Sequence, residues 1–592
     1  MASVSNSIDL KRSSSGSYPM QTSDYIPPPQ PIPAPIAEEN SKSPIPASIR
    51  ACKDANHTNQ QGRTIVVCLD GTGDQFDNDN SNVVHFVSCL KKHERNKQVT
   101  YYQSGIGTYD KGGLKNGIGA ALDGAVGSGL GVHIVDAYKY LMQNYREGDR
   151  ICLLGFSRGA YTVRCLAGML HKVGLLPASN GSQVNFAYDF YKDDTEEGWK
   201  MSAEFKKTFC TDVNVYFVGV WDCVASVGFF PRKLPFSKSP TNSIGYFRHA
   251  MALDEHRAKF KICQWQQQDP GNSGANNDVV AQGIDRRLTF DDTPKAKLRR
   301  TFNCFGSGKK EKAIAQAQED AAVEKQAHAA RHHSFHIHDD DESDQKSQKT
   351  MEQSRLESSF NAVDAKNRKN PACKTDVSEV WFMGAHADIG GGAVPNERRH
   401  MLSRIPLRWM IRQCFECNTG ILFDVARLAE QGLDIHTLYP IYQPPTQPSV
   451  IPPNSVLERY ETKTLPAIQH RSKMVPIGEN SYVAPPFAPE SDHHYAHLPE
   501  CTEDHFDARE PVNDQLVQAK GWWVLELWPV KVRVLQRNGV GWVKKVRWNL
   551  GRYRAIRDQA PKMHWTVHRR IEEGKYVCKG RTDDKTVWKV VA

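Results

Sequence analysis

The chain has 592 residues, of which 39% are hydrophobic and 24% are charged, and its formal net charge is +9. This length predicts several domains, or one domain with insertions, and the low hydrophobic content indicates that part of the chain does not enter a compact core. A net charge this small over so long a chain does not by itself indicate a nucleic-acid-binding protein.

The N-terminal segment, residues 1–62, is rich in serine and proline and has no apolar core of a signal peptide. We expect a disordered tail, with a polyproline-prone part at Pro27–Pro35. The longest weakly apolar stretch, Gly117–Val135, contains Asp123 and His133 among many glycines, which excludes a membrane span. The expected location is therefore intracellular, in the cytoplasm or at a membrane surface.

Strands and helices alternate from Arg63 onward. The apolar patterns predict strands at Thr64–Leu69, Val99–Tyr102, Ile151–Leu154, Val213–Val220 and Val377–Met383, and helices at Asn82–Leu90, Val132–Tyr145, Ala160–Val173, Phe247–Phe260 and Arg404–Phe415. Gly174 is placed to end the helix that precedes it. This alternation is typical of an α/β fold with a mainly parallel sheet and helices on both faces.

Composition divides the chain further. We expect a catalytic domain in two parts, 63–268 and 375–437, separated by a low-complexity insertion at 269–374 and followed by a Pro-rich loop or lid at 438–515 and a basic, Trp-rich region at 516–592. The insertion contains a His/Asp tract, His332–Asp341, which can bind metal, although a disordered insertion is the favoured interpretation. Cys304, flanked by basic residues, is weak evidence for an acylation site.

The C-terminal region concentrates tryptophan and positive charge. Seven of the twelve tryptophans follow residue 520, and Val530–Ile556 holds eight Lys or Arg with no Asp or Glu. Asn538-Gly539 predicts a β-hairpin. A basic, Trp-rich ribbon suits an anionic membrane surface, which we place at 520–560, and also single-stranded nucleic acid, which we do not expect here. The alternative is a small β-subdomain that packs its tryptophans on the core.

The fourteen cysteines form no framework. Cys68, Cys152, Cys165 and Cys223 lie in apolar runs, where cysteine behaves as a small core residue. The one C-x-x-C motif, Cys414–Cys417, has no second pair at zinc-binding spacing. We expect reduced thiols and no bound metal.

The most informative motif is G-x-S-x-G at Gly155–Gly159, between a predicted strand and a predicted helix. This arrangement is a nucleophile elbow, in which the turn holds its serine in a strained conformation and leaves no room for side chains on the flanking residues. It predicts Ser157 as a nucleophile, against the alternative of a structural turn.

A serine nucleophile needs a histidine base and a carboxylate that orients it, and on this fold they follow in the order Ser, Asp, His at strand ends. Asp222 and His386 fit, since each follows a predicted strand. Asp388 is a rival to Asp222, but lies too close to His386 in sequence to reach its ring, and we expect it to anchor the glycine loop around it. The other competing side chains, which we expect at the surface of the helix Phe247–Phe260, are His249, Asp254 and His256.

The oxyanion of an acyl-transfer intermediate needs backbone donors. We expect one from Arg158, the residue after the nucleophile, and a second from Gly71 or Thr72 after the first strand. Asp70 is expected to brace that loop. No step requires a metal ion or an organic cofactor.

Four segments together, Leu69–Thr72, Gly155–Tyr161, Val220–Asp222 and Gly384–Gly392, resemble the type VI secretion phospholipase effector family (first class) of the α/β-hydrolase superfamily, which has many uncharacterised fungal relatives. The resemblance covers about Arg63–Cys263 and Val377–Phe423. It implies a triad of Ser157, Asp222 and His386 and cleavage of phospholipid acyl esters, in the manner of a phospholipase A.

Three functions are therefore compatible with the sequence. The favoured one is a lipid-directed ester hydrolase. The others are a soluble carboxylesterase, whose basic C-terminal region only packs on the core, and a catalytically silent membrane or scaffold protein that keeps the fold.

Overall fold

The computed structural model describes residues 45–56, 62–105, 128–225, 234–237, 243–265, 352–364, 375–445, 451–475, 495–496 and 498–592. Contacts divide the chain into one unit made of Met1–Gln267 and Phe360–Ala592 and a second, Gln268–Ser359, of which 352–359 are described and helical. The His/Asp tract His332–Asp341, Cys304 and the polyproline segment lie outside the described residues.

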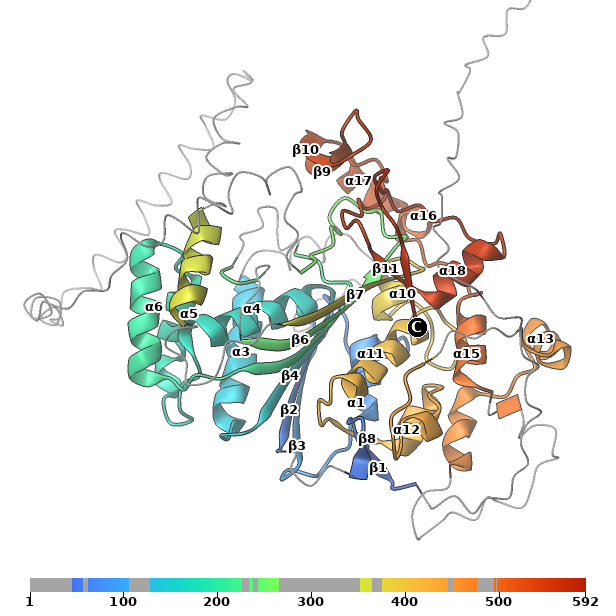
Figure 1. The fold of residues 1–592 in the computed structure, drawn as a ribbon, viewed down its shortest axis with the longest axis horizontal. Helices are drawn as coiled ribbons and strands as arrows, with labels where there is room; N and C mark the ends of the chain where they lie inside the picture. The colour runs from blue at the N-terminus through green and yellow to red at the C-terminus, as the bar shows by residue number, and fades with distance from the viewer. Residues whose placement is uncertain are drawn as a thin grey trace, which may run out of the picture. The chain divides into compact units, whose positions relative to one another are not determined.

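An eight-stranded parallel sheet forms the centre of the first unit (Figure 1). Its strands, in spatial order, are β12 (Lys589–Val591), β11 (Lys562–His564), β7 (Asp376–Phe382), β6 (Ile244–Ala252), β5 (Val215–Trp221), β4 (Arg150–Phe156), β2 (Thr64–Leu69) and β3 (Gln98–Gln103). All pairings between them are parallel. The predicted α/β fold class is confirmed.

Helices cover both faces of this sheet (Figure 1). One face carries α3 (Ser128–Asn144), α4 (Ser157–Val173), α5 (Val184–Lys192) and α6 (Glu196–Phe209), with the short 3-10 helix η2 (Gly181–Gln183) before α5. The other face carries α1 (Asn82–Cys89), α11 (Arg404–Glu416) and α12 (Val425–Glu430), and α15 (Glu500–Asp507) packs against α11.

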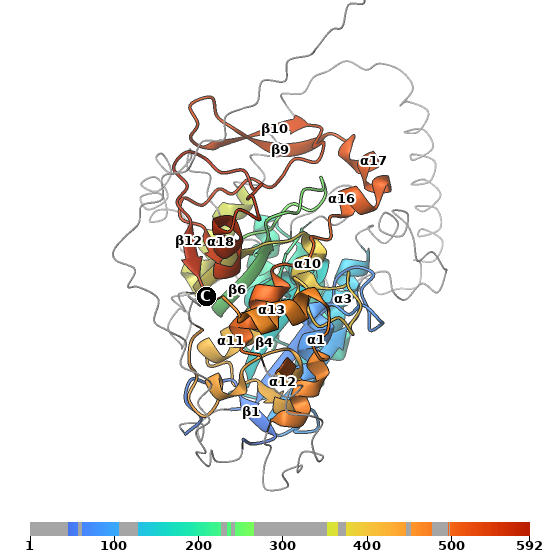
Figure 2. The ribbon, with the colours of Figure 1, turned by 90° about the vertical axis from the view of Figure 1, so that its right-hand side faces the viewer.

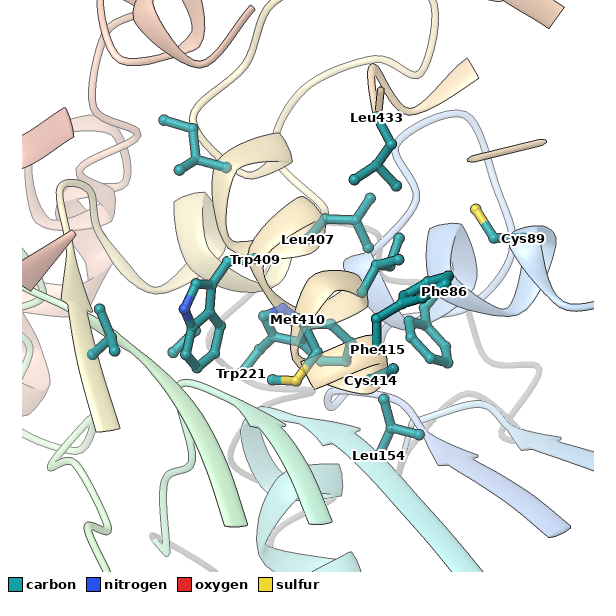
Figure 3. Packing of buried hydrophobic residues seen from close by; sticks show 14 of the residues in the cluster. Phe86, Cys89, Leu154, Trp221, Leu407, Trp409, Met410, Cys414, Phe415 and Leu433 are labelled. Atoms are coloured by element: carbon teal, nitrogen blue, oxygen red, sulfur yellow. The ribbon is translucent and has the colours of Figure 1, made fainter. Parts of the chain in front are cut away.

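Two apolar cores lie on the two faces, because successive side chains of a strand point to opposite sides. Ile65 and Val67 of β2 enter the core beneath α3 and α4, whereas Val66 enters the core beneath α1 and α11. Figure 3 shows the second core, in which Trp221 of β5 lies among side chains of α11 and α1. Both faces of the interior strands β2, β4 and β5 are buried, as expected for a parallel sheet.

The remaining elements lie outside the main sheet and the helices named above. They are β1 (Ser48–Arg50), α10 (His386–Gly390), β8 (Leu422–Asp424), η5 (Ile435–Thr437), α13 (Asn454–Glu461), η6 (Ile468–Met474), α16 (Gln515–Gln518), η7 (Lys520–Trp522), α17 (Trp523–Glu526), β9 (Val530–Leu535), β10 (Trp542–Arg547) and α18 (Trp565–Glu572). Strands β9 and β10 pair antiparallel around Asn538-Gly539, as the sequence predicts. In both views this hairpin lies above α10 and α16 (Figures 1 and 2).

The predicted helix Phe247–Phe260 is wrong. Its first part is β6, an interior strand between β5 and β7. A strand buried on both faces has no alternation of apolar and polar residues, so the spacing of Phe247, Ala250 and Met251 fits a helix equally well.

Three other segments differ from expectation. Residues 45–56 of the predicted tail are ordered, because β1 pairs with β8 and buries Ile49. The predicted loop Leu438–Pro499 contains α13 and η6. The C-terminal region contributes β11 and β12 to the main sheet rather than only a separate ribbon. No helix in the described ranges has the length and apolar character to cross a bilayer.

Candidate active site

The turn between β4 and α4 places Ser157 at the carboxyl edge of the sheet. Its backbone φ is +57°, a left-handed conformation that non-glycine residues rarely adopt. A Cβ on Gly155 would lie 2.7 Å from the carbonyl oxygen of Gly159, and a Cβ on Gly159 would lie 2.3 Å from that of Asp70. Only glycine therefore fits two residues before and two residues after the serine.

The structure brings Ser157, His386 and Asp222 together from three different strand ends. The His386 Nε2 lies 2.8 Å from the Ser157 Oγ, and its Nδ1 lies 2.5 Å from the Asp222 Oδ2. The exposed fractions are 6% for Ser157, 6% for His386 and 0% for Asp222. Since Nδ1 donates to the carboxylate, Nε2 is left to accept the serine proton.

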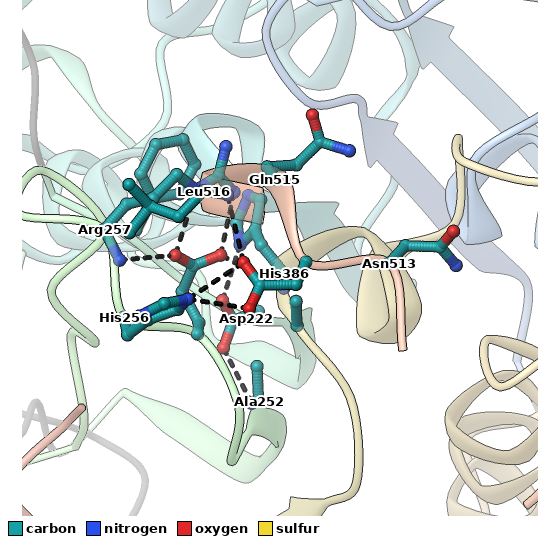
Figure 4. Close-up of polar contacts among 12 residues, drawn as sticks. Asp222, Ala252, His256, Arg257, His386, Asn513, Gln515 and Leu516 are labelled. Carbon is teal, nitrogen blue, oxygen red and sulfur yellow. Dashed lines mark hydrogen bonds and ion pairs between the residues drawn. The ribbon is translucent and has the colours of Figure 1, made fainter. Parts of the chain in front are cut away.

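Asp222 follows β5 and has more partners than a triad requires. Its Oδ1 accepts from the Ala252 backbone N–H at 2.9 Å (Figure 4) and from Arg554 Nη1 at 2.6 Å, and its Oδ2 accepts from Arg554 Nη2 at 2.9 Å. Burial alone would raise the pKa of Asp222, but the Arg554 charge and the bond from His386 outweigh it and hold that pKa well below its usual range. Asp222 is thus ionised at neutral pH.

His386 lies at the start of α10, which follows β7. Its ring is 4.7 Å, centroid to centroid, from Phe156 and 4.8 Å from Phe260. Burial lowers the pKa of His386, and the bond to Asp222 offsets this only in part. The imidazole is therefore neutral at neutral pH, the state in which it can accept a proton.

The loop of His386 is braced by two carboxylates. Asp388 accepts from the Ala385 N–H at 2.8 Å and from the backbone and side chain of Asn513 at 2.9 and 2.6 Å, and burial raises its pKa to about 6. Asp254 accepts from the Gly384 N–H at 2.7 Å. Gly384 has φ of +120° and no room for a Cβ beside Asp388.

The competing residues are not surface helix residues, which corrects that expectation. His249 is fully buried in β6, where its Nδ1 meets Glu379 at 2.8 Å and its Nε2 accepts from the Cys223 N–H at 3.1 Å. His256 bonds Asp514, at 2.9 Å to each carboxylate oxygen (Figure 4). Asp254, described above, is 5% exposed. None of the three contacts Ser157.

The loop after β2 lies beside the elbow. Asp70 accepts from the Gly71 N–H at 2.8 Å, from Ser81 Oγ at 2.9 Å and from Tyr102 Oη at 2.8 Å. The Gly71 N–H is thus already bonded. Thr72, the next residue, has a buried hydroxyl with no hydrogen-bond partner in the part of the chain that the structure describes. Arg158 is the second residue of α4, where no intrahelical carbonyl can reach its N–H.

Sequence reasoning missed three residues that surround Ser157, Asp222 and His386. Glu255 accepts from the His386 N–H at 3.3 Å and is paired with Arg257, whose guanidinium outweighs the effect of burial and lowers the pKa of Glu255 to about 2. Arg554 reaches Asp222 from a position 332 residues away. Phe260 covers the His386 ring. None has a local motif, and only the positive charge of the C-terminal region indicated that arginines gather there.

No three His, Cys, Asp or Glu side chains within the described ranges are grouped so that they could hold a metal ion.

Comparison with known proteins gives a family and a relative. A family model described as "T6SS, Phospholipase effector Tle1-like, catalytic domain" matches residues 63–413, more than half of the chain. The uncharacterised protein YEL023C of Saccharomyces cerevisiae is 24% identical over 605 residues, which cover 88% of this chain and 81% of that protein.

Two solved structures are also similar. An uncharacterised protein from Pseudomonas aeruginosa is 13% identical over 61% of this chain, with a TM-score of 0.26. The Tle1 effector bound to the VgrG spike of the type 6 secretion system is 19% identical over 34% of this chain, with a TM-score of 0.19. The matched part spans 47% of each of those chains, about half their length.

Proposed function

The chain belongs to the T6SS Tle1-like phospholipase effector family by its catalytic domain, and from this premise we propose that it is a serine hydrolase that cleaves phospholipid acyl esters. The observation that carries the proposal is the hydrogen-bond relay from Ser157 Oγ through the His386 ring to Asp222, at 2.8 and 2.5 Å. These distances suit transfer of the serine proton to the imidazole.

The proposed reaction has two halves. Ser157 Oγ attacks the ester carbonyl while His386 Nε2 takes its proton, and collapse of the tetrahedral intermediate transfers the acyl group to the serine as the alcohol leaves with that proton. Water then attacks the acyl-serine, with His386 again as base and then as acid, and releases the fatty acid. Asp222 keeps the ring in the required tautomer and stabilises the imidazolium.

The oxyanion is assigned to the N–H groups of Arg158 and Thr72. The Arg158 N–H is at the N-terminus of α4, where the helix dipole favours negative charge. Thr72 is preferred over Gly71 because the Gly71 N–H donates to Asp70. Asp70 would then act on the loop and not on the substrate, and Asp388 on the loop of His386.

A surface beside the site supports a lipid substrate over a soluble ester. We define the C-terminal patch as the exposed apolar side chains of α17 and β10 and the segments next to them, together with nearby exposed cations: Trp523, Val524, Leu527, Trp528, Val546, Trp548, Leu550, Lys531, Lys544, Lys545 and Arg547. Indoles and cations together suit the headgroup region of an anionic membrane.

The patch adjoins the proposed catalytic base. The Trp522 ring, next to Trp523, lies 5.5 Å from Phe260, and Phe260 lies 4.8 Å from His386. A membrane that bound the patch would therefore lie near the site.

The test is replacement of the nucleophile. Ser157→Ala should lower hydrolysis of short p-nitrophenyl esters by about 10⁵-fold or more and abolish labelling by a fluorophosphonate probe. Ser182→Ala, at an exposed serine, is the matched control and should behave as wild type. Undiminished labelling of Ser157→Ala would refute the assignment. Hydrolysis of a phospholipid panel, measured by mass spectrometry, tests the substrate class.

A further inference from the structure

Arg554 lies in the basic C-terminal region yet is buried, with 8% of its surface exposed. Its two terminal nitrogens grip both oxygens of Asp222, at 2.6 and 2.9 Å. This two-pronged geometry is the strong form of an arginine–carboxylate pair. The cations that belong to the C-terminal patch face solvent. Arg554 differs from them in being buried, which indicates a separate role.

The rest of the guanidinium is bonded as well. Nη1 also donates to the Ala252 carbonyl at 3.1 Å, and Nε and Nη2 donate to the Phe260 carbonyl at 3.1 and 2.7 Å. Arg554 therefore ties together the end of β5, the end of β6 and the loop whose phenylalanine covers His386. Lysine has one charged nitrogen and cannot make this set of contacts.

The segment that carries Arg554 is itself fastened beside the site. Glu526 of α17 accepts from the Ala258 N–H at 2.5 Å, from Asn549 Nδ2 at 2.7 Å and from the Gly551 N–H at 2.9 Å. These bonds fix the backbone on both sides of the hairpin against the loop that follows β6. Arg554 is thus held in place by the same region that bears the patch.

We propose that Arg554 is a positioning residue of the triad, which orients the Asp222 carboxylate toward His386 and holds Phe260 over the imidazole. The inference rests on the proposed function and deepens it, since it makes the C-terminal region part of the hydrolase site. Arg554 acts through Asp222 and does not contact the reacting atoms.

The proposed role of the Arg554 charge predicts a specific change in the pH dependence of kcat/KM. The other charged groups that face His386 and Asp222 are Glu255 and Arg257, which pair with each other at 2.8 Å. Removal of the Arg554 charge leaves the Asp222 carboxylate with His386 as its one cationic partner once the ring is protonated. The imidazolium is then more stable, so the acid limb of kcat/KM should move to higher pH.

The experiment compares Arg554→Gln, Arg554→Lys and a control, Arg537→Gln, at an exposed arginine of the same region that lies outside the C-terminal patch. Activity is measured with p-nitrophenyl esters, and thermal unfolding is the check on folding. Arg554→Gln should lower kcat by about 10²-fold with little change in KM and shift the acid limb upward. Arg554→Lys keeps the charge but not the geometry, so it should lower kcat and leave the acid limb near that of wild type. Arg537→Gln should match wild type.

Outcomes separate this inference from the proposed function. Folded Arg554 variants with wild-type kcat and pH profile would overturn the role of Arg554, even if Ser157→Ala is inactive. If Arg554→Gln does not fold, the kcat of Arg554→Lys decides: a loss supports the role and a wild-type value overturns it. Activity retained in Ser157→Ala would instead remove the hydrolase proposal itself.

Discussion

At the scale of single residues, the site depends on backbone conformations that ordinary side chains avoid. Ser157 and Asp222 have φ of +57° and +37°, and the structure around them supplies the bonds that hold these conformations. Ser157 was predictable because a strand, a tight turn and a helix follow one another within a short stretch of sequence. Arg554 was not, because nothing local distinguishes one buried arginine in a basic run from its exposed neighbours.

The lowered pKa of His386 has a kinetic consequence. The proposed reaction needs the neutral ring, and burial places the pKa below the ordinary 6.5. As the pH falls, activity should therefore stay level through 6.5 and decline only as the pH passes the lower pKa of His386. The measurement is kcat/KM against pH with an ester that has no ionisable group of its own.

Thermal unfolding over the same pH range is the control, because loss of the fold would also reduce activity. An acid limb centred above pH 6.5 in the folded wild-type protein would contradict this prediction.

At the scale of elements, the residues at strand ends were easier to predict than the interior strand that lies between those strands. Asp222 and His386 follow β5 and β7, whose apolar runs are evident in the sequence. The strand between them, β6, has buried polar side chains such as Arg248 and His249, and its pattern favoured a helix. Its neighbours in space, not its periodicity, make it a strand, since each side pairs with a parallel strand.

The C-terminal patch, on the β9–β10 hairpin and α17, leads to a prediction about membrane binding. Each cation near an anionic leaflet contributes about 1 kcal/mol to binding, so Lys544→Gln with Lys545→Gln should weaken association by about 30-fold. Trp548→Ala should weaken it further through loss of the interfacial indole. Co-sedimentation with phosphatidylcholine vesicles, with and without phosphatidylserine, measures both effects.

The matched control removes two exposed lysines from elsewhere, Lys139→Gln on α3 and Lys200→Gln on α6. Equal weakening by the control pair would show a general charge effect and contradict the assignment to the patch. Unchanged activity on a soluble ester in the patch variants would show that their site is intact.

At the scale of the molecule, the sheet and the site both combine segments that are far apart in the chain. The fold class, the hairpin and most strands follow from local apolar patterns and turn residues. The addition of β11 and β12 to the edge beside β7 could not be predicted in this way, because strands of three residues give too little periodicity to detect. The Arg554–Asp222 pair could not be predicted from local sequence either, because it forms only when the C-terminal region packs against the sheet.

Removal of residues 514–592 should therefore prevent folding. The deletion takes away two strands of the main sheet, β11 and β12, and the buried side chains Ile556, Met563 and Val567, whose burial alone contributes about 5–9 kcal/mol. A domain is stable by only about 5–15 kcal/mol. Size-exclusion chromatography and circular dichroism should show aggregated or unfolded protein.

The patch variants Lys544→Gln and Lys545→Gln are the control for this deletion, because they change the same region and keep its core. A truncated chain that stays monomeric and unfolds cooperatively at the wild-type temperature would contradict the prediction.

The long separation between Asp222 and Arg554 also bears on when the protein becomes active. Ser157, Asp222 and His386 are synthesised well before Arg554. During translation Asp222 is therefore present before its guanidinium partner. On the role proposed for Arg554, a nascent chain that ends before this residue carries Ser157, Asp222 and His386 but lacks the residue that positions Asp222. On the proposed function, the chain becomes a competent hydrolase only after synthesis has passed Arg554.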